Sequence, residues 1–246
     1  MKVTVFTAGR TGSQFLYELI KANFDNTELF EWFSPSFVRA SEEINDEEFL
    51  TYISKQMKTT NLPFASKVTP HIFDARWKDS KKNIEAVLEA TKCTKQIYMC
   101  RMDFFGLCVS DWIANLTGRW HSNRPVTETR YLPFKRVVAD MYQAESAMLE
   151  TFKSYAGEHA AVTFYECLNA SPLTFTMSTM RYITGRAVCI NEIVSDMPTK
   201  RVLNSDSSEY KSIISTLSSE DLDFFYETKN CRDKKVKEIL YQFEVI

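Results

Sequence analysis

The pattern of apolar and polar residues predicts strands that alternate with amphipathic helices. Short apolar or β-branched runs predict four strands, at residues 2–7, 64–69, 96–101 and 160–165. Apolar residues at helical spacing predict helices at residues 14–23, 45–58, 79–90, 104–116, 134–155 and 173–183. Residues 28–33 are interpreted as a loop or short strand, and from residue 205 the pattern is polar and helical with no further strand expected.

This alternation indicates one α/β domain over residues 1–246, in which helices flank a parallel sheet and residues 205–246 form a helical C-terminal segment. Ligands of such sheets bind at the carboxyl ends of the strands. We therefore expect the residues that carry chemistry to follow the strands directly.

Composition narrows the function classes. The chain is 44% hydrophobic and 25% charged with a net charge of −2, which is typical of a soluble globular protein and lacks the basic excess of nucleic-acid binding. No stretch approaches the ~20 apolar residues of a membrane span, and the short apolar run at the N-terminus is not expected to act as a signal peptide. Six cysteines without metal-ligand spacing are interpreted as reduced, buried thiols of a cytoplasmic protein.

The strongest local feature is TAGRTGSQFL, Thr7–Leu16, where Gly9 and Gly12 lie between a predicted strand and a predicted helix. Backbone N–H groups of such a loop, together with the helix N-terminus, favour an anion. Arg10 adds a positive charge. The alternative is an ordinary turn with a capping serine. The loop lacks the lysine of nucleotide triphosphatases, which argues against ATP or GTP chemistry.

Arg101, at the end of a predicted strand, is the second candidate, with Ser110 nine residues later. An arginine in this place can bind a phosphate. It can equally pair with Asp103, two residues further on.

Five segments in order resemble the bacterial trehalose-type family of sulfotransferases, which use 3′-phosphoadenosine 5′-phosphosulfate (PAPS) on a P-loop-like sheet. Together they span residues 4 to about 185. The segments are TAGRTGSQFL (7–16), FEWF (30–33), FASKVTPHIF (64–73), TGRWH (117–121) and VTFYECLNASP (162–172).

The resemblance implies transfer of a sulfuryl group from PAPS, without a metal, to a hydroxyl of a small-molecule or carbohydrate acceptor. It implies Glu31 as general base, Lys67 near the phosphosulfate, and His121 as a positioning residue or rival base. The family separates its arginine and serine by one residue less, so a neighbour of Arg101 stays open as the 3′-phosphate ligand. The residues implied in cofactor binding are Gly9, Arg10, Thr11, Gly12, Ser13, Gln14, Arg101 and Ser110.

Other readings stay open beside this one. A kinase-like phosphotransferase on the same fold would need Mg²⁺ and the missing lysine, and a non-catalytic nucleotide-binding protein would have no use for Glu31. Tyr165 and Glu166 are interpreted as structural, with Glu166 expected to hold the loop after Gly12. Lys200 and Arg201 either cover the nucleotide or lie in a solvated loop, and a homodimer is left open.

Overall fold

The computed structural model describes residues 2–24, 28–30, 51, 55, 64–69, 88, 93, 95–119, 129–189, 191, 211–212 and 214–246. The strands are β1 (Lys2–Thr7), β2 (Glu28–Phe30), β3 (Phe64–Val68), β4 (Lys95–Cys100), β5 (Ala160–Phe164) and β6 (Glu244–Val245). The helices are α1 (Ser13–Asn23), α5 (Phe104–Thr117), α6 (Phe134–Tyr155), α7 (Tyr165–Ala170), α8 (Pro172–Thr184) and α10 (Ser219–Leu240). The helices predicted at 45–58 and 79–90 lie almost wholly outside the described residues.

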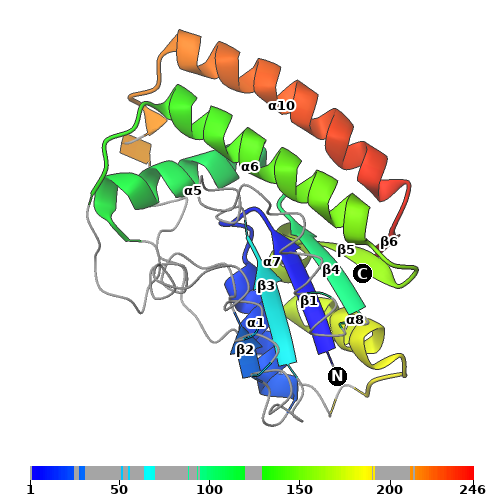
Figure 1. Ribbon diagram of the computed structural model, residues 1–246. Helices are drawn as coiled ribbons and strands as arrows, with labels where there is room; N and C mark the ends of the chain where they lie inside the picture. The colour runs from blue at the N-terminus through cyan, green and yellow to red at the C-terminus, as the bar shows by residue number, and fades with distance from the viewer. Residues whose placement is uncertain are drawn as a thin grey trace.

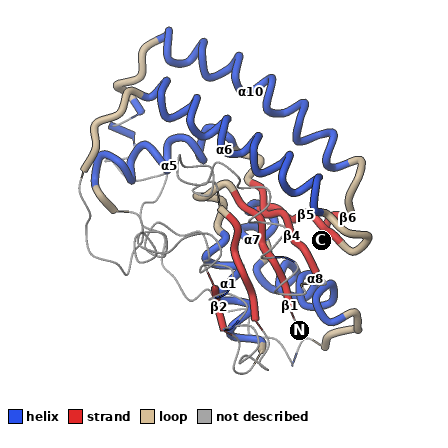
Figure 2. The backbone as a smooth tube through the Cα atoms, in the orientation of Figure 1, coloured by secondary structure: helices blue, strands red, loops and turns tan. Residues whose placement is uncertain are grey.

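All strands of the sheet run parallel, in the order β2-β3-β1-β4-β5-β6. Figure 2 shows the strands in red and the helices in blue. β1 is central, and its Val5 lies between Lys67 of β3 and Ile97 of β4. The predicted α/β class with a helix-flanked parallel sheet is therefore confirmed.

The expectation that no strand follows residue 205 is wrong, because the chain ends by adding β6 to the edge of the sheet. Ile246 N–H donates to the carbonyl of Val162 at 2.9 Å, and the Thr163 hydroxyl donates to the Ile246 carbonyl at 2.8 Å. A two-residue strand is too short to show alternation in a sequence. Its pairing with β5 alone makes it a strand.

Helices cover both faces of the sheet. Successive side chains of a strand point to opposite faces, so buried strands present apolar side chains on each face. On one face Val3 and Val5 of β1 pack with α1 and α8. On the other face Phe6 and Tyr98 pack with Phe152 of α6 and with α10. Figure 1 shows α6 and α10 side by side over this second face, and α1 and α8 on the first.

A buried ion pair joins α10 to α6. Arg232 donates from Nε to Oε2 of Glu145 at 2.7 Å and from Nη2 to Oε1 at 2.8 Å, and both side chains are 1% exposed. Arg232 also donates to the backbone carbonyls of Arg101 and Met102, directly after β4. Burial acts to lower the pKa of Arg232, but the hydrogen bonds and charge of Glu145 raise it overall, so the guanidinium stays charged. One side chain thus fixes α10, α6 and the β4–α5 loop together.

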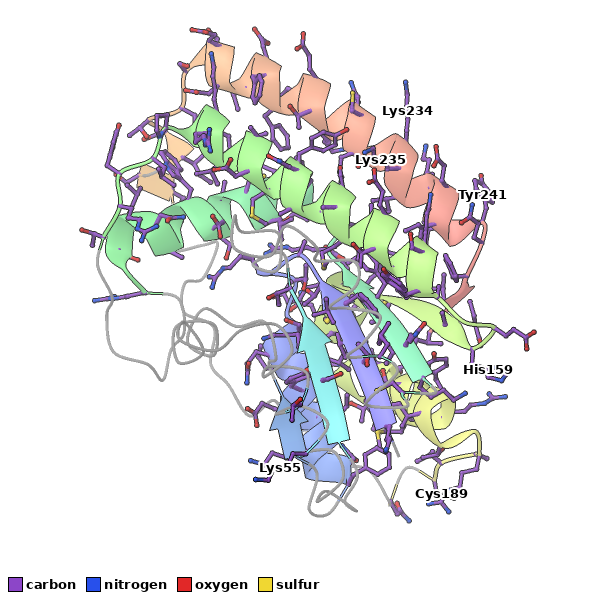
Figure 3. The ribbon with its side chains drawn as sticks, viewed as in Figure 1. Lys55, His159, Cys189, Lys234, Lys235 and Tyr241 are labelled. Atoms are coloured by element: carbon purple, nitrogen blue, oxygen red, sulfur yellow. The ribbon has the colours of Figure 1, made fainter. Side chains whose placement is uncertain are left out.

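The outer side of α10 is polar and faces solvent. Lys234 and Tyr241 project away from the body of the protein (Figure 3), and Tyr241 is 90% exposed. Lys235 lies toward α6, with Nζ 3.6 Å from Oε1 of Glu150. Within the described ranges no helix is both long and apolar enough to cross a membrane.

The cysteines correct one expectation. All six are free, and Cys100 and Cys108 are buried as expected. Cys93 is half-buried, and Cys167 of α7, Cys189 after α8 and Cys231 of α10 are exposed.

The Glu145–Arg232 pair should be a large term in stability. Arg232→Met would leave Glu145 buried without its counter-charge, so the free energy of unfolding in urea should fall by about 3–5 kcal/mol. Lys153→Met is the matched control, since Lys153 and Glu238 form an exposed pair between the same two helices at 3.3 Å. That variant should lose less than about 1 kcal/mol. Similar losses for the two variants would contradict this account.

Candidate functional site

The loops after β1 and β4 diverge from adjacent strands at the same edge of the sheet. From β1 the chain passes through α1 to β2 on one side, and from β4 it passes through α5 and α6 to β5 on the other (Figure 1). This reversal is the topological switch point, where doubly wound sheets bind their ligands. The two sequence motifs, at residues 7–16 and around Arg101, both lie here.

The loop after β1 has a left-handed backbone at three positions: φ is +74° at Gly9, +51° at Arg10 and +82° at Gly12. Arg10 is the one non-glycine residue of positive φ among the described residues. This conformation costs a residue with a Cβ about 1 kcal/mol. The N-cap of α1 is Gly12, which has no side chain. The first N–H groups of α1 therefore have no capping side chain at this position to accept their hydrogen bonds. A strained loop that opens onto a helix N-terminus has the backbone geometry of an anion site.

The polar side chains of the loop differ in what they contact. The Thr11 hydroxyl is buried and bonds the hydroxyl of Thr7, and Ser13 is 7% exposed. Gln14 donates to Glu18 at 3.0 Å, within α1. Among these side chains, Arg10 is the one whose described hydrogen bond leads to a distant element, α5.

Arg10 contacts Ser110 of α5. Its Nε and Nη2 donate to the Ser110 hydroxyl at 3.2 and 3.0 Å. Burial lowers the pKa of Arg10, the nearby charge of Asp111 opposes this, and the positive charge of Arg101 lowers the pKa further. The charge of Arg101 therefore acts on Arg10, and the larger influence of Asp111 opposes it.

Arg101 lies just beyond β4 and forms the alternative pair that the sequence left open. Its Nη2 is 3.3 Å from Oδ2 of Asp103, and its guanidinium lies 4.8 Å from the centre of the Tyr165 ring. Its Nε is buried and has no hydrogen-bond partner among the described residues. Ser110, expected beside Arg101, instead contacts Arg10.

Tyr165 and Glu166, at the carboxyl end of β5, support both loops. The Tyr165 ring lies against Gly12, where an added Cβ would be 2.5 Å from Cδ2 of the ring. Glu166 accepts hydrogen bonds from the N–H groups of Met102 and Asp103, each at 3.0 Å. The expectation that Glu166 holds the loop after Gly12 is therefore wrong: its carboxylate reaches two N–H groups of the adjacent β4 loop. The side chain that reaches Gly12 is Tyr165, and its position directly after a buried strand was the signal for it.

The predicted catalytic residues are placed only in part. Lys67 is half-buried on β3, with Nζ 5.4 Å from the centre of the Tyr17 ring of α1. Glu31 and His121 lie outside the described residues, as do Lys200 and Arg201. His159 precedes β5 and so lies at the amino end of the sheet, away from this site (Figure 3).

The chain matches no protein-family model and no curated protein. Among the residues that the structure describes, no three His, Cys, Asp or Glu side chains gather as a metal site requires. The site is therefore defined by its own geometry: two arginines, a strained glycine loop and a helix N-terminus.

Asp111, next to Ser110, should make stability depend on pH. Burial raises its pKa from 3.8 to about 6, although Arg10 and a hydrogen bond from Asn115 oppose the shift and Asp140 adds to it. The folded state thus keeps a proton that the unfolded chain releases. This contribution is present below about pH 4 and lost as pH rises through about 6, a change of roughly 1–3 kcal/mol.

Asp111→Asn should remove this slope in urea unfolding measured from pH 4 to 7. Glu158→Gln, in the exposed turn before β5, is the control and should keep the slope. An unchanged slope in Asp111→Asn would show that another group is responsible.

Proposed function

We propose that this protein is a sulfotransferase that moves a sulfuryl group from PAPS to a hydroxyl of an acceptor, which the family resemblance suggests is a carbohydrate. The observation that carries this function is the position of Arg10 and Arg101 in the loops after β1 and β4, the adjacent strands of the switch point.

The two guanidinium groups interact electrostatically, and each has a carboxylate nearby: Asp111 beside Arg10 and Asp103 beside Arg101. Burial lowers the pKa of Arg10, the charge of Asp111 opposes this, and the charge of Arg101 lowers the pKa further. The buried Nε of Arg101 lacks an acceptor in the described part of the chain. A buried donor left unpaired costs roughly 1–3 kcal/mol. Oxygens of a phosphate or phosphosulfate would accept charge-assisted bonds from both arginines and remove that cost.

The loop favours PAPS over a nucleoside triphosphate. Its sequence, TAGRTGSQFL, has no lysine to bridge β- and γ-phosphates. A ligand with two separate anionic groups suits two arginines held on different loops. In our proposal Arg10, oriented by Ser110, and the N-terminus of α1 bind the 5′-phosphosulfate, while Arg101 binds the 3′-phosphate.

The proposed reaction is a single displacement at sulfur. The acceptor oxygen forms a bond to sulfur, the bond from sulfur to the 5′-phosphate oxygen breaks, and the hydroxyl proton passes to Glu31. The leaving group is 3′-phosphoadenosine 5′-phosphate (PAP), and Arg10 stabilises the charge that develops on it. Glu31 is the next residue after Phe30, the last of β2, and so follows a parallel strand in the sequence. Six free cysteines fit a reducing compartment, which agrees with a cytoplasmic location.

Ligand choice tests the cofactor. By calorimetry PAP should bind without added metal and at least about tenfold more tightly than ATP with Mg²⁺, a difference of roughly 1.4 kcal/mol. Arg10→Ala should weaken PAP binding by about 1.5–3 kcal/mol, the range for hydrogen bonds to charged groups. Arg136→Ala, a 67% exposed arginine on α6, should bind PAP normally. Tighter binding of ATP with Mg²⁺ would favour a phosphotransferase and reject our proposal.

Turnover tests the general base. Glu31→Gln keeps the shape of the side chain but cannot accept the proton, so sulfuryl transfer should fall by about 10²–10⁴-fold while PAP affinity stays close to wild type. Glu28→Gln, three residues earlier, is the control and should stay active. If Glu31→Gln keeps full turnover and His121→Ala loses it, His121 is the base. Binding of PAP without any transfer would leave a nucleotide-binding protein in place of an enzyme.

A further inference from the structure

We propose that Tyr165 is a positioning residue that sets the separation of the two anion-binding groups, acting through Arg101. This role rests on the proposed function. It concerns one side chain at the end of β5, the strand beyond β4 in the sheet.

The first contact of Tyr165 is with the anion loop. A Cβ on Gly12 would lie 2.5 Å from Cδ2 and 3.1 Å from Cε2 of the Tyr165 ring. The ring therefore occupies the space that a side chain at position 12 would take, and it limits how far the loop can move toward β5.

The second contact is with Arg101, whose guanidinium lies 4.8 Å from the centre of the same ring. A cation over an aromatic face is attracted by the negative charge of that face. One half-buried ring thus touches the loop after β1 and the arginine after β4, and it spans the distance between them.

The backbone around Arg101 is held in place by hydrogen bonds with two side chains. Glu166 holds the N–H groups of Met102 and Asp103 from one side, and Arg232 holds the carbonyls of Arg101 and Met102 from the other. The remaining freedom lies in the side-chain torsions of Arg101. The Tyr165 ring and Asp103 restrict these torsions, so the ring should decide where the guanidinium meets a second anionic group.

The test compares PAP with adenosine 5′-phosphate (AMP), which lacks only the 3′-phosphate. If Tyr165 positions Arg101, Tyr165→Leu should lower the ratio of PAP to AMP affinity by about 3- to 30-fold. Tyr165→Phe keeps the ring and should restore the wild-type ratio. In an Arg101→Ala background, Tyr165→Leu should change the ratio no further, because the group it positions is gone.

If Tyr165 had a purely structural role, its substitution would lower the stability of the protein but leave the ratio of PAP to AMP affinity unchanged. Leu168→Ala, at a fully buried position of the same short helix, is the matched control and should lower the melting temperature while keeping the PAP to AMP ratio. Tyr165→Met keeps most of the buried volume and is measured in parallel, so it carries the test if the Leu variant does not fold.

The outcomes separate this inference from the function itself. A wild-type protein that does not bind PAP rejects the proposed function. A wild-type protein that binds PAP, with variants Tyr165→Leu or Tyr165→Met that keep the ratio, overturns the role of Tyr165 alone. Loss of the ratio in Tyr165→Phe would also overturn it, because the hydroxyl and not the ring would then matter.

Discussion

The ion pair between Glu145 and Arg232 is the interaction on which the arrangement of this protein depends. The two charged side chains are each 1% exposed, and each needs the other as its counter-charge. α6 and α10 therefore cannot separate without leaving an unpaired charge in the core. The same guanidinium satisfies the carbonyls after β4, where the chain leaves the sheet. α10 therefore holds the β4–α5 loop in place, although the two lie about 130 residues apart in the sequence. This loop carries Arg101.

The candidate site follows from this constraint and from the order of the strands. β1 and β4 are adjacent, their loops diverge, and each loop carries an arginine that the sheet brings toward the other. Unfavourable features concentrate here: a left-handed backbone at Arg10, and a buried Arg101 donor without an acceptor among the described residues. Folded proteins retain such costs where a ligand or a reaction offsets them. Tyr165 and Glu166, the first residues of α7, contact the two loops of the site from the carboxyl end of β5.

Much of the fold could be predicted, because its elements are long and their apolar periodicity is strong. The helix expected at residues 134–155 is α6 with the same bounds, and the expected end at Gly185 is a left-handed cap with φ of +69°. β6 could not be predicted, since two residues show no period. Of the candidate site, the places of Arg10 and Arg101 directly after strands were predicted, and the structure has them there. One of their partners could be predicted, because Asp103 is two residues from Arg101 in the sequence. The other could not, because Arg10 and Ser110 are 100 residues apart.

The sequence by itself determined which residues form strands and helices, that the sheet is parallel, and that chemistry-bearing side chains follow the strands. These properties are local: they depend on side-chain periodicity, on glycine at positions of positive φ, and on the polarity of each turn. Only the tertiary structure decided that Ser110 serves Arg10, that Glu166 holds the β4 loop, and that Arg232 is fully buried. These depend on distances between segments far apart in the chain. Such distances are set by how the two faces of the sheet pack against their helices, and no single segment encodes them.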